Sequence, residues 1–364
     1  MITALKRPEA LQAVLAHEIA HIANGHLTRR AANARVANRV TAIGFALATA
    51  AAIKGEGQAA AGIAGGTANS ARRVFFSHTR AEEASADQAG LRYLAQAGID
   101  PSAMGDVMEL FRGQEALRPG RQDPYAITHP LSRDRLRAIK GYVAGLKSTT
   151  RPSTAETNYW YDRMDAKLQG FLRKPAYVLR RKTAKGNGET AVLRRAIAYH
   201  RQPSPKRAVA EMAQLLKMRP RDPYYHELHG QILLEQRQIN GAIAAYKNAV
   251  SLAPNEPLIL AGLGNAYLAS ETPAGEREAL RILQKARGRD PGDPGLLRSL
   301  ALAHARNGQN GLASVATAER YAILGRFADA KTHAERAMGV LPRGSSGWLR
   351  AQDVTDAAGR AGVK

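Results

Sequence analysis

The sequence predicts a mainly α-helical protein in two parts, the second of which is a solenoid of repeated helical hairpins. Three observations predict this fold class. Apolar residues recur at three- and four-residue spacing in segments of residues 8–146, as they do on one face of a helix. A period of 34 residues appears in the second half of the chain. The length of 364 residues also exceeds one ordinary domain of about 150 residues, so two domains are expected.

Four helices are expected in the first half of the chain. They cover residues 8–27, 82–97, 102–117 and 133–146. An Ala/Gly-rich stretch at 42–68 separates the first two and is interpreted as packing residues or a mobile cover. The longest uncharged run there, Val40–Ile53, is shorter than the roughly twenty residues that a membrane span needs. A Pro/Gly-rich loop at 119–130 precedes the last helix.

Residues 148–154 have the Ser/Thr/Pro composition of a linker, and we place the domain boundary at residue 150. Residues 1–150 are then the first domain, residues 151–189 a linker and connecting helix, and residues 190–364 the repeats. The opening residues, Met1–Arg7, are not followed by the apolar segment and cleavage site of a secretory signal.

Two consecutive helical hairpins fit the tetratricopeptide repeat. In the first, the small, aromatic and proline positions of the repeat are occupied by Gly230, Ala242, Tyr246, Ala249 and Pro254. The next unit ends at Pro291 and has three extra residues, and weaker units precede and follow these two. Small residues let the two helices of a unit approach closely, while bulky ones fill the space that the next unit leaves. A helical array without register explains these matches less well.

Composition excludes several classes of protein. The hydrophobic content of 45% is too high for a chain disordered throughout, and the absence of cysteine excludes thiol catalysis, disulfide bonds and cysteine-ligated metal sites. The formal net charge is +22, of which residues 151–364 carry +15. Such a field attracts nucleic acid, an anionic membrane or an acidic protein surface. Because aromatic residues are only 5% of the chain and do not alternate with basic ones, nucleic-acid binding is not expected.

The chemistry lies in the first domain, in the segment His17-Glu18-Ile19-Ala20-His21. Residues four apart share one face of a helix, so both imidazoles can reach one metal ion. Glu18 lies one step around the helix, where it can take a proton from a water molecule at the metal. This is the His-Glu-x-x-His zinc motif. The alternative is two helix histidines beside an exposed glutamate, and a random match has a chance of roughly one in a hundred.

A third ligand is expected on the helix predicted at 82–97. Glu83 and Asp87 are four residues apart and share a face. One can therefore bind the metal while the other accepts the free N–H of a ligand histidine. Glu82 has no partner at that spacing and is expected to point to solvent.

Two further histidines are not expected to bind the metal. His26 follows His21 by five residues, whereas the third ligand in the extended form of the motif follows by six. His26 is interpreted as a structural residue or one that supports a ligand. His78 has no ligand spacing and is interpreted as a loop histidine near the site.

Three segments together resemble the family of zinc metallopeptidases that contains the HtpX heat-shock protease and the CAAX prenyl protease. In chain order they are His17–His26, Arg80–Asp87 and Thr128–Leu136. The repeats, with the closing segment Gly347–Asp353, are similar to those of the periplasmic BepA-like branch of the family. The resemblance covers nearly the whole chain and implies a zincin-like (gluzincin) fold for the first domain.

The resemblance implies one zinc ion per chain and a role for seven residues. The zinc ligands are His17, His21 and Glu83. The general base is Glu18. The residues that support the ligands are Arg80, Asp87 and Arg135. Members of the family carry a signal peptide and a strand-bearing segment before the zinc helix, whereas seven residues precede Pro8 here. We therefore expect a metallopeptidase domain that is truncated at its N-terminus relative to the family.

His129 is expected to act in catalysis from the loop before the last helix of the domain. Pro130 restricts its backbone to an extended form. Its imidazole can donate a hydrogen bond to the oxyanion formed during attack on a peptide. It can instead occupy the open position on the metal and hold the enzyme inactive until the loop moves. We favour the second role, because the basic repeat domain that follows offers a way to move the loop.

These features together predict a zinc-dependent endopeptidase with a protein-binding repeat domain. The resemblance implies a periplasmic location, unfolded or misassembled outer-membrane proteins as substrates, and an envelope protein as partner of the repeats. The positive charge adds an anionic membrane surface as a partner. The alternative is a non-catalytic tetratricopeptide scaffold or chaperone with a vestigial zinc site, which metal content would distinguish. No glycine-rich phosphate-binding motif is present, so phosphate-loop chemistry is not expected.

Overall fold

The structure is a computed structural model of residues 1–364. It describes all of them except 27–28, 30–38, 40, 44, 50–52, 54–56, 115–116, 118–120, 130–132, 147–149, 203 and 364, and the side chains of 57, 59–60, 62–65, 67–78 and 127 are also left out. Parts of the predicted Ala/Gly-rich stretch, of the loop at 119–130 and of the linker at 148–154 therefore lie outside the described residues. The described part of the chain contains helices and no strand, which confirms the mainly α-helical prediction.

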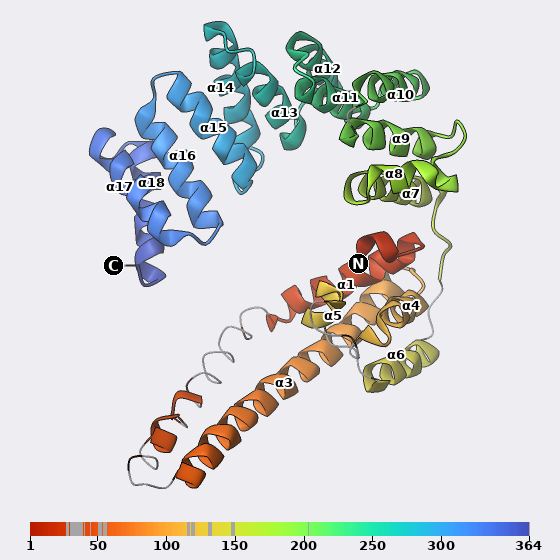
Figure 1. The fold of residues 1–364 in the computed structure, drawn as a ribbon, viewed down its shortest axis with the longest axis vertical. Coiled ribbons are helices and arrows are strands. Elements are labelled where there is room, and N and C mark those ends of the chain that lie inside the picture. The colour runs from red at the N-terminus through yellow and green to blue at the C-terminus, as the bar shows by residue number, and fades with distance from the viewer. Residues whose placement is uncertain are drawn as a thin grey trace. The chain divides into compact units, whose positions relative to one another are not determined.

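The chain forms two compact units, Met1–Asp165 and Ala166–Lys364 (Figure 1). The division falls inside the helix α7 (Ala155–Leu172), whereas the composition of the sequence placed the domain boundary at residue 150. None of the described helices has the length and apolar character that a membrane crossing requires.

The first unit is built around two helices, α1 and α3, that pack along each other. Its elements before α7, among the described residues, are η1 (Ile2–Ala4), α1 (Pro8–Ala23), α3 (Gly57–Gln96), α4 (Ser102–Phe111), α5 (Pro124–Thr128) and α6 (Arg133–Gly145). α4 packs on both α1 and α6, and the shared core contains Val14, Leu91, Met104 and Ile139. In Figure 1, α3 runs well past the other labelled helices of this unit.

Two helices of the first unit end earlier than predicted. α1 stops at Ala23 and not at residue 27, because Gly25 adopts a left-handed backbone with φ 65°. α4 stops at Phe111 and not at residue 117, and Gly113 follows with φ 85°. Both predictions were wrong because apolar periodicity continues past a turn that ends the helix.

α3 is longer than predicted. The pattern at 82–97 marks only its C-terminal part, whereas the helix begins at Gly57 and includes Ala/Gly-rich sequence. Alanine favours a helix on any face and glycine disfavours it, so neither residue gives this segment the apolar stripe on which the prediction depended. The amphipathic pattern therefore missed this part of the helix.

α1 and α3 approach closely through small side chains. Ala20, Ala86 and Ala89 form a buried cluster between them. A Cβ added to Gly90 of α3 would lie 3.3 Å from the backbone nitrogen of His17 and 2.9 Å from the side chain of Met104. The close approach places the carboxylates of α3 beside the histidines of α1.

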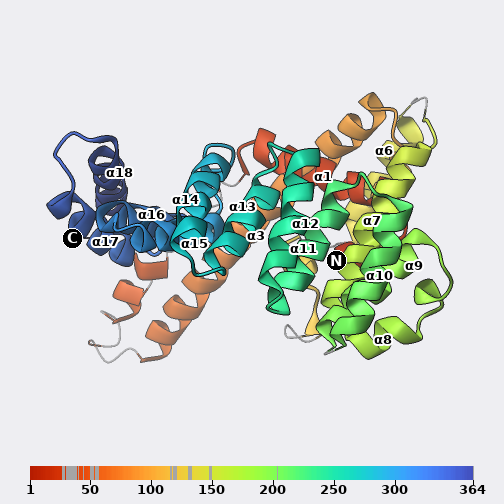
Figure 2. The same ribbon diagram turned by 90° about the horizontal axis from the view of Figure 1, so that it is seen from above.

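The second unit is a row of helical hairpins. After α7 its elements are α8 (Pro175–Arg180), η4 (Lys182–Ala184), α9 (Glu189–Arg201), α10 (Pro205–Met218), α11 (Pro223–Glu235), α12 (Ile239–Leu252), α13 (Pro257–Leu268), α14 (Pro273–Arg287), α15 (Pro294–Arg306), α16 (Asn310–Ile323), α17 (Phe327–Val340) and α18 (Ser346–Arg360). From α9 onward each helix packs against the next, and Figure 2 shows the hairpins following one another in chain order. The prediction of a tetratricopeptide-type solenoid is confirmed.

The small residues that predicted the repeat lie where two helices touch. A Cβ added to Gly230 of α11 would lie 2.7 Å from the ring of Tyr246 in α12. A Cβ added to Gly264 of α13 would lie 2.5 Å from the side chain of Leu283 in α14. Ala242 is fully buried in the same core. These two hairpins therefore each close around a position that has no room for a side chain.

Candidate metal centre

Four side chains from three parts of the first unit come together. His17 and His21 of α1, Glu83 of α3 and His129 at the end of α5 place donor atoms within 4.8 Å of one another. The first three side chains are buried, and His129 is half-buried. The structure thus brings the three predicted ligands together and adds His129 to them.

The spacing of these donors suits one metal ion of the size of zinc. Ligand atoms about 2.0–2.1 Å from Zn²⁺ stand about 3.3–3.4 Å apart at the corners of a tetrahedron. His17 Nε2 lies 3.0 Å from His21 Nε2 and 3.4 Å from Glu83 Oε2. His21 Nε2 lies 3.5 Å from Glu83 Oε1. His129 Nδ1 lies 3.4 Å from His17 Nε2 and 3.1 Å from Glu83 Oε2. Nitrogen and carboxylate donors at these distances are as close together as neighbouring ligands of one metal ion.

A buried arginine fixes the carboxylates behind the donors. Arg135 donates from Nε and Nη2 to the two oxygens of Asp87 at 2.8 and 2.9 Å. Its Nη1 lies 3.1 Å from Glu83 Oε2. Asp87 Oδ1 in turn lies 3.0 Å from Nδ1 of His17, the ring nitrogen that faces away from the other donors. Arg135 therefore orients one ligand directly and a second through Asp87.

The charges of the group shift its pKa values. Burial alone would lower the pKa of His17, but Asp87 and Glu83 beside it raise this pKa to about 9. Burial would raise the pKa of Glu83, yet contacts with three histidines and the charge of Arg135 hold it far below its usual range. The pKa of Asp87 is lowered against burial by His17 and Arg135. The two carboxylates are therefore kept ionised inside the protein by the histidines and by Arg135.

Glu18 lies at the open side of the donor group. Its side chain is 41% exposed, and its Oε1 lies 3.4 Å from His129 Nε2. Burial and the adjacent Glu18 carboxylate raise the pKa of the Tyr125 phenol above its usual range. A carboxylate oxygen adjacent to the donors can accept a proton from a water molecule there.

Tyr125 is a part of the site that sequence reasoning missed. It lies in α5, a short helix inside a segment predicted to be a loop, and its ring packs on that of His129 with centroids 4.5 Å apart. Asp123 caps α5 by accepting a hydrogen bond from Tyr125 N at 3.0 Å, and it also pairs with the amino group of Met1 at 2.9 Å. The four-residue spacing of Tyr125 and His129 could have predicted that the two side chains lie on the same face of a short helix.

Arg80, a predicted site residue, and Glu82, which was expected in solvent, both lie elsewhere than expected. Arg80 is exposed and makes no hydrogen bond or ion pair with the described residues, so the structure does not bring it to the donors. Glu82 was expected to point to solvent, and this was wrong, since its side chain is only 8% exposed. Glu82 lies near His26. Burial and the adjacent His21 lower the pKa of His26, and the charge of Glu82 partly raises it again. The side chain of His78 lies outside the described residues.

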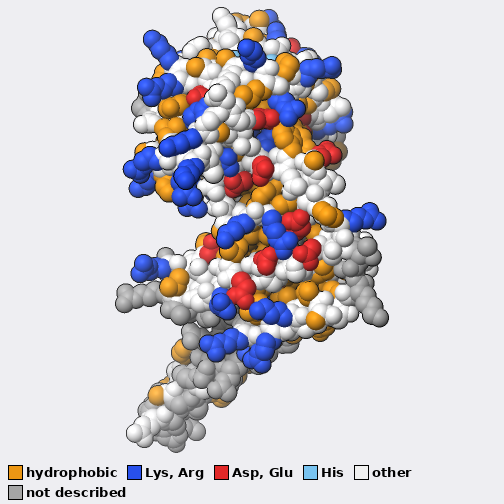
Figure 3. Space-filling view, turned by 90° about the vertical axis from the view of Figure 1, so that its right-hand side faces the viewer, with side chains coloured by type: hydrophobic (Ala, Val, Ile, Leu, Met, Phe, Trp, Pro, Cys, Tyr) orange, Lys and Arg blue, Asp and Glu red, His pale blue; other side chains and the backbone are white. Residues whose placement is uncertain are grey.

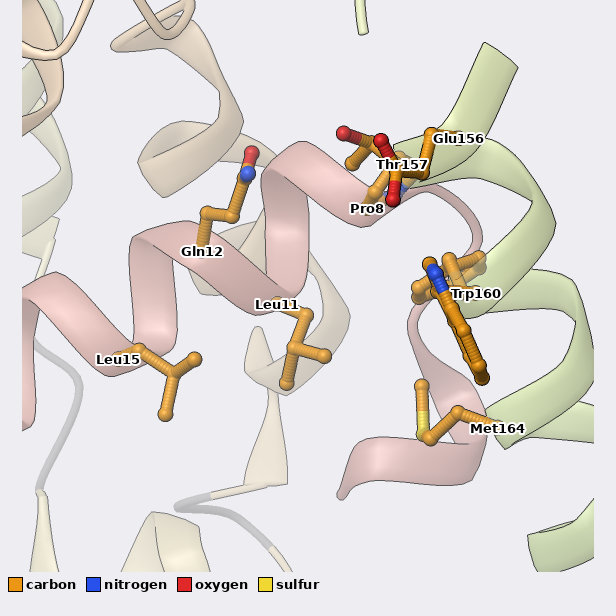
Figure 4. Close-up of a pocket in the computed structure, with 9 residues that line it drawn as sticks. Pro8, Leu11, Gln12, Leu15, Glu156, Thr157, Trp160 and Met164 are labelled. Atoms are coloured by element: carbon orange, nitrogen blue, oxygen red, sulfur yellow. The ribbon is translucent and has the colours of Figure 1, made fainter. Parts of the chain in front are cut away.

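A separate cavity of about 400 Å³ lies beside the N-terminal half of α1 (Figure 4). Leu11 and Leu15 of α1 and Trp160 and Met164 of α7 contribute to its lining, and none of the four metal donors does. The cavity is therefore distinct from the metal centre.

The two units match different families. Residues 1–143 match the model of peptidase family M48, and residues 230–270 match the model of a TPR repeat. A TPR protein from Thermus thermophilus superimposes on 46% of this chain and 98% of its own, with 20% sequence identity and a TM-score of 0.32.

Two relatives are similar over both units. The beta-barrel assembly-enhancing protease of Escherichia coli (strain K12) is 29% identical over 324 residues, which cover 87% of this chain and 64% of that protein. The beta-barrel assembly-enhancing protease of Yersinia pestis is 27% identical over 338 residues, which cover 88% of this chain and 65% of that protein. The chain thus spans less than two thirds of the length of these relatives.

Proposed function

We propose that this chain, in which a peptidase family M48 domain precedes TPR repeats, is a zinc-dependent endopeptidase. The observation that carries the proposal is the group of four donors with Glu18 on its open side. Two imidazoles and a carboxylate are a ligand set that catalytic zinc uses, and the fourth position is then left for substrate. The resemblance of the chain to two proteases supports the same activity.

His17, His21 and Glu83 would hold the zinc ion, with Asp87 and Arg135 keeping the ligands in place. When bound, zinc supplies a Lewis acid that polarises a peptide carbonyl and activates a water molecule. Glu18 accepts the proton of the attacking water and passes it to the leaving amine. Its position suits both steps, because its Oε1 faces the donor group while the rest of the side chain is partly exposed.

His129 holds the fourth donor position in the resting protein. This role is supported by its Nδ1, which is as close to His17 Nε2 and Glu83 Oε2 as neighbouring ligands of one ion are. A peptide carbonyl needs that position, so the imidazole must move before substrate binds. In the alternative role, the same imidazole donates a hydrogen bond to the oxyanion during attack.

Outer-membrane proteins in an unfolded or misassembled state are the proposed substrates, and the periplasm is the proposed location. The two relatives support this assignment, since both are named beta-barrel assembly-enhancing proteases. The repeats bind a partner in the envelope, because stacked helical hairpins present an extended surface for protein binding. Their positive charge favours an acidic protein surface or anionic lipid headgroups.

The proposal is tested with the zinc-loaded chain and an unfolded outer-membrane β-barrel protein. Mass spectrometry should detect new peptide products that Glu18→Gln no longer forms, while elemental analysis finds one zinc ion in both proteins. The glutamine cannot accept the proton, and removal of a general base lowers turnover by about 10²–10⁴-fold. Glu156→Gln, at an exposed glutamate of α7, should cleave normally.

Three results would contradict the proposal. A chain without zinc, or unchanged zinc content in His21→Ala, would remove the metal site. Zinc at full content without any cleavage would favour a non-catalytic scaffold or chaperone that keeps a vestigial site.

A further inference from the structure

His26 lies behind the metal centre and has no part in the proposed chemistry. Its side chain is only 1% exposed. Its Nδ1 lies 2.9 Å from Nδ1 of His21, and the two rings meet edge to face with centroids 4.8 Å apart. It does not belong to the group of four donors. The contact therefore joins a ligand to a buried residue that is not a ligand.

The turn after α1 creates this contact. On a continuous α-helix, residue 26 would point about 140° away from the direction of His21. Gly25 instead has φ 65°, and its N–H donates to the carbonyl oxygen of Ile22 at 3.0 Å. The backbone turns there, and the imidazole of His26 comes back against His21. Glycine adopts this conformation without steric cost.

The contact determines the tautomers of both rings. His21 Nε2 faces the other donors, 3.0 Å from His17 Nε2. A histidine that binds a metal through Nε2 carries its proton on Nδ1. Two ring nitrogens 2.9 Å apart share a single proton, so Nδ1 of His26 must accept it. His26 then carries its own proton on Nε2.

We propose that His26 is a positioning residue, which accepts the Nδ1–H of His21 and so keeps Nε2 of His21 directed at the zinc ion. The inference rests on the metal site of the proposed function and adds a residue to it. The two histidines of the motif are then oriented by different kinds of group at their Nδ1 atoms. A carboxylate, Asp87, faces Nδ1 of His17, whereas an imidazole accepts from Nδ1 of His21.

The test compares substitutions of His26 that differ in where they place an acceptor. His26→Asn puts its amide oxygen near the position of Nδ1, whereas His26→Gln reaches toward the position of Nε2. The zinc dissociation constant of the full chain is measured by competition with a chromophoric chelator. We expect His26→Asn to stay within about threefold of the parent and His26→Gln and His26→Ala to bind zinc about 10–100-fold more weakly.

His304→Gln is the matched control. His304 is 5% exposed and its Nδ1 lies 2.7 Å from Gln309 Oε1, but it belongs to the second unit. Its substitution should leave zinc affinity unchanged. Equal weakening in His26→Asn and His26→Gln, or unchanged affinity in all three variants of His26, would overturn the inference.

A second measurement needs no substitution. Long-range ¹H–¹⁵N spectra of the zinc-loaded chain with labelled histidine report which ring nitrogen carries each proton. We expect the proton of His26 on Nε2, and a proton on its Nδ1 would overturn the inference. Peptide cleavage is measured in parallel: normal zinc affinity without cleavage would contradict the proposed function and leave the role of His26 in place.

Discussion

At the scale of single residues, one buried cation keeps two carboxylates together. Arg135 is 6% exposed and lies within ion-pair distance of both Glu83 and Asp87, which are also buried. Removing one member of a buried charge cluster leaves the others uncompensated in a medium that solvates them poorly. Arg135 should therefore contribute most to the stability of the protein when no metal ion is bound.

Arg135→Met should destabilise the metal-free protein by about 3–5 kcal/mol, because two buried carboxylates lose the arginine that pairs with both of them. Arg137→Met is the control, since Arg137 and its partner Asp134 are 78% and 85% exposed and such pairs contribute about 0–1 kcal/mol. Thermal and urea unfolding after dialysis against a chelator measure the difference. Equal stability of the two variants would contradict the role given to Arg135.

His129→Ala should raise basal proteolysis with zinc content unchanged, because the fourth donor position is then open to substrate. Initial rates of peptide release, compared with the parent at equal zinc content, measure the effect. If the imidazole stabilises the oxyanion, the same substitution lowers turnover by about 10²-fold or more. Loss of activity with zinc retained would therefore replace the blocking role by the catalytic one.

At the scale of elements, the contacts between helices depend on positions without a side chain. Gly90 lets α3 lie against α1 beside His17, and Gly230 lets α11 lie against Tyr246 of α12. The first contact builds the metal centre, while the second closes a repeat. In both, the neighbouring helix occupies the place where a Cβ would be.

Gly230→Ala should destabilise the repeat unit by about 1–3 kcal/mol, since the new Cβ would overlap the ring of Tyr246. Gly339→Ala is the control, because nothing lies within 4 Å of its added Cβ in α17. There the alanine should leave stability unchanged or raise it by up to about 1 kcal/mol. Urea unfolding followed by circular dichroism compares the two, and equal effects would contradict the tight contact.

At the scale of the whole molecule, positive charge is carried mainly by the second part of the chain. Residues 151–364 account for +15 of the net +22. Figure 3 shows Lys and Arg side chains spread over the visible face of the repeat unit, with fewer acidic side chains among them. Such a surface attracts acidic partners over a distance that salt shortens to about 8 Å at physiological ionic strength.

Binding of the full chain to the proposed envelope partner should weaken steeply with added salt, because screening removes the attraction of the basic surface. Sedimentation with isolated envelope fractions and with vesicles containing anionic lipid, at several salt concentrations, measures it. Vesicles of neutral lipid are the control. Binding that does not change with salt would exclude the electrostatic contribution, and absence of binding to every fraction would exclude the proposed partner.

The sequence by itself determined the two-part helical fold, the repeat and the residues that form the core of the candidate metal centre. Spacing of three and four residues reports which side chains share one helix face, so His17 could be grouped with His21, and Glu83 with Asp87, from their positions alone. The repeat was equally predictable, because Gly230 and its counterparts mark places where neighbouring helices leave no room.

The tertiary structure decided what depends on turns and on packing between helices. Gly25 ends α1 and returns His26 to His21, a contact that a continuous helix would forbid. Glu82 is buried, although the pattern of its own helix assigned it to solvent. Tyr125 reaches the site only because α5 forms in a predicted loop. A periodic pattern shows which residues share one face of a single helix. The positions of His26, Glu82 and Tyr125 depend instead on where the chain turns and on which other element packs against each residue.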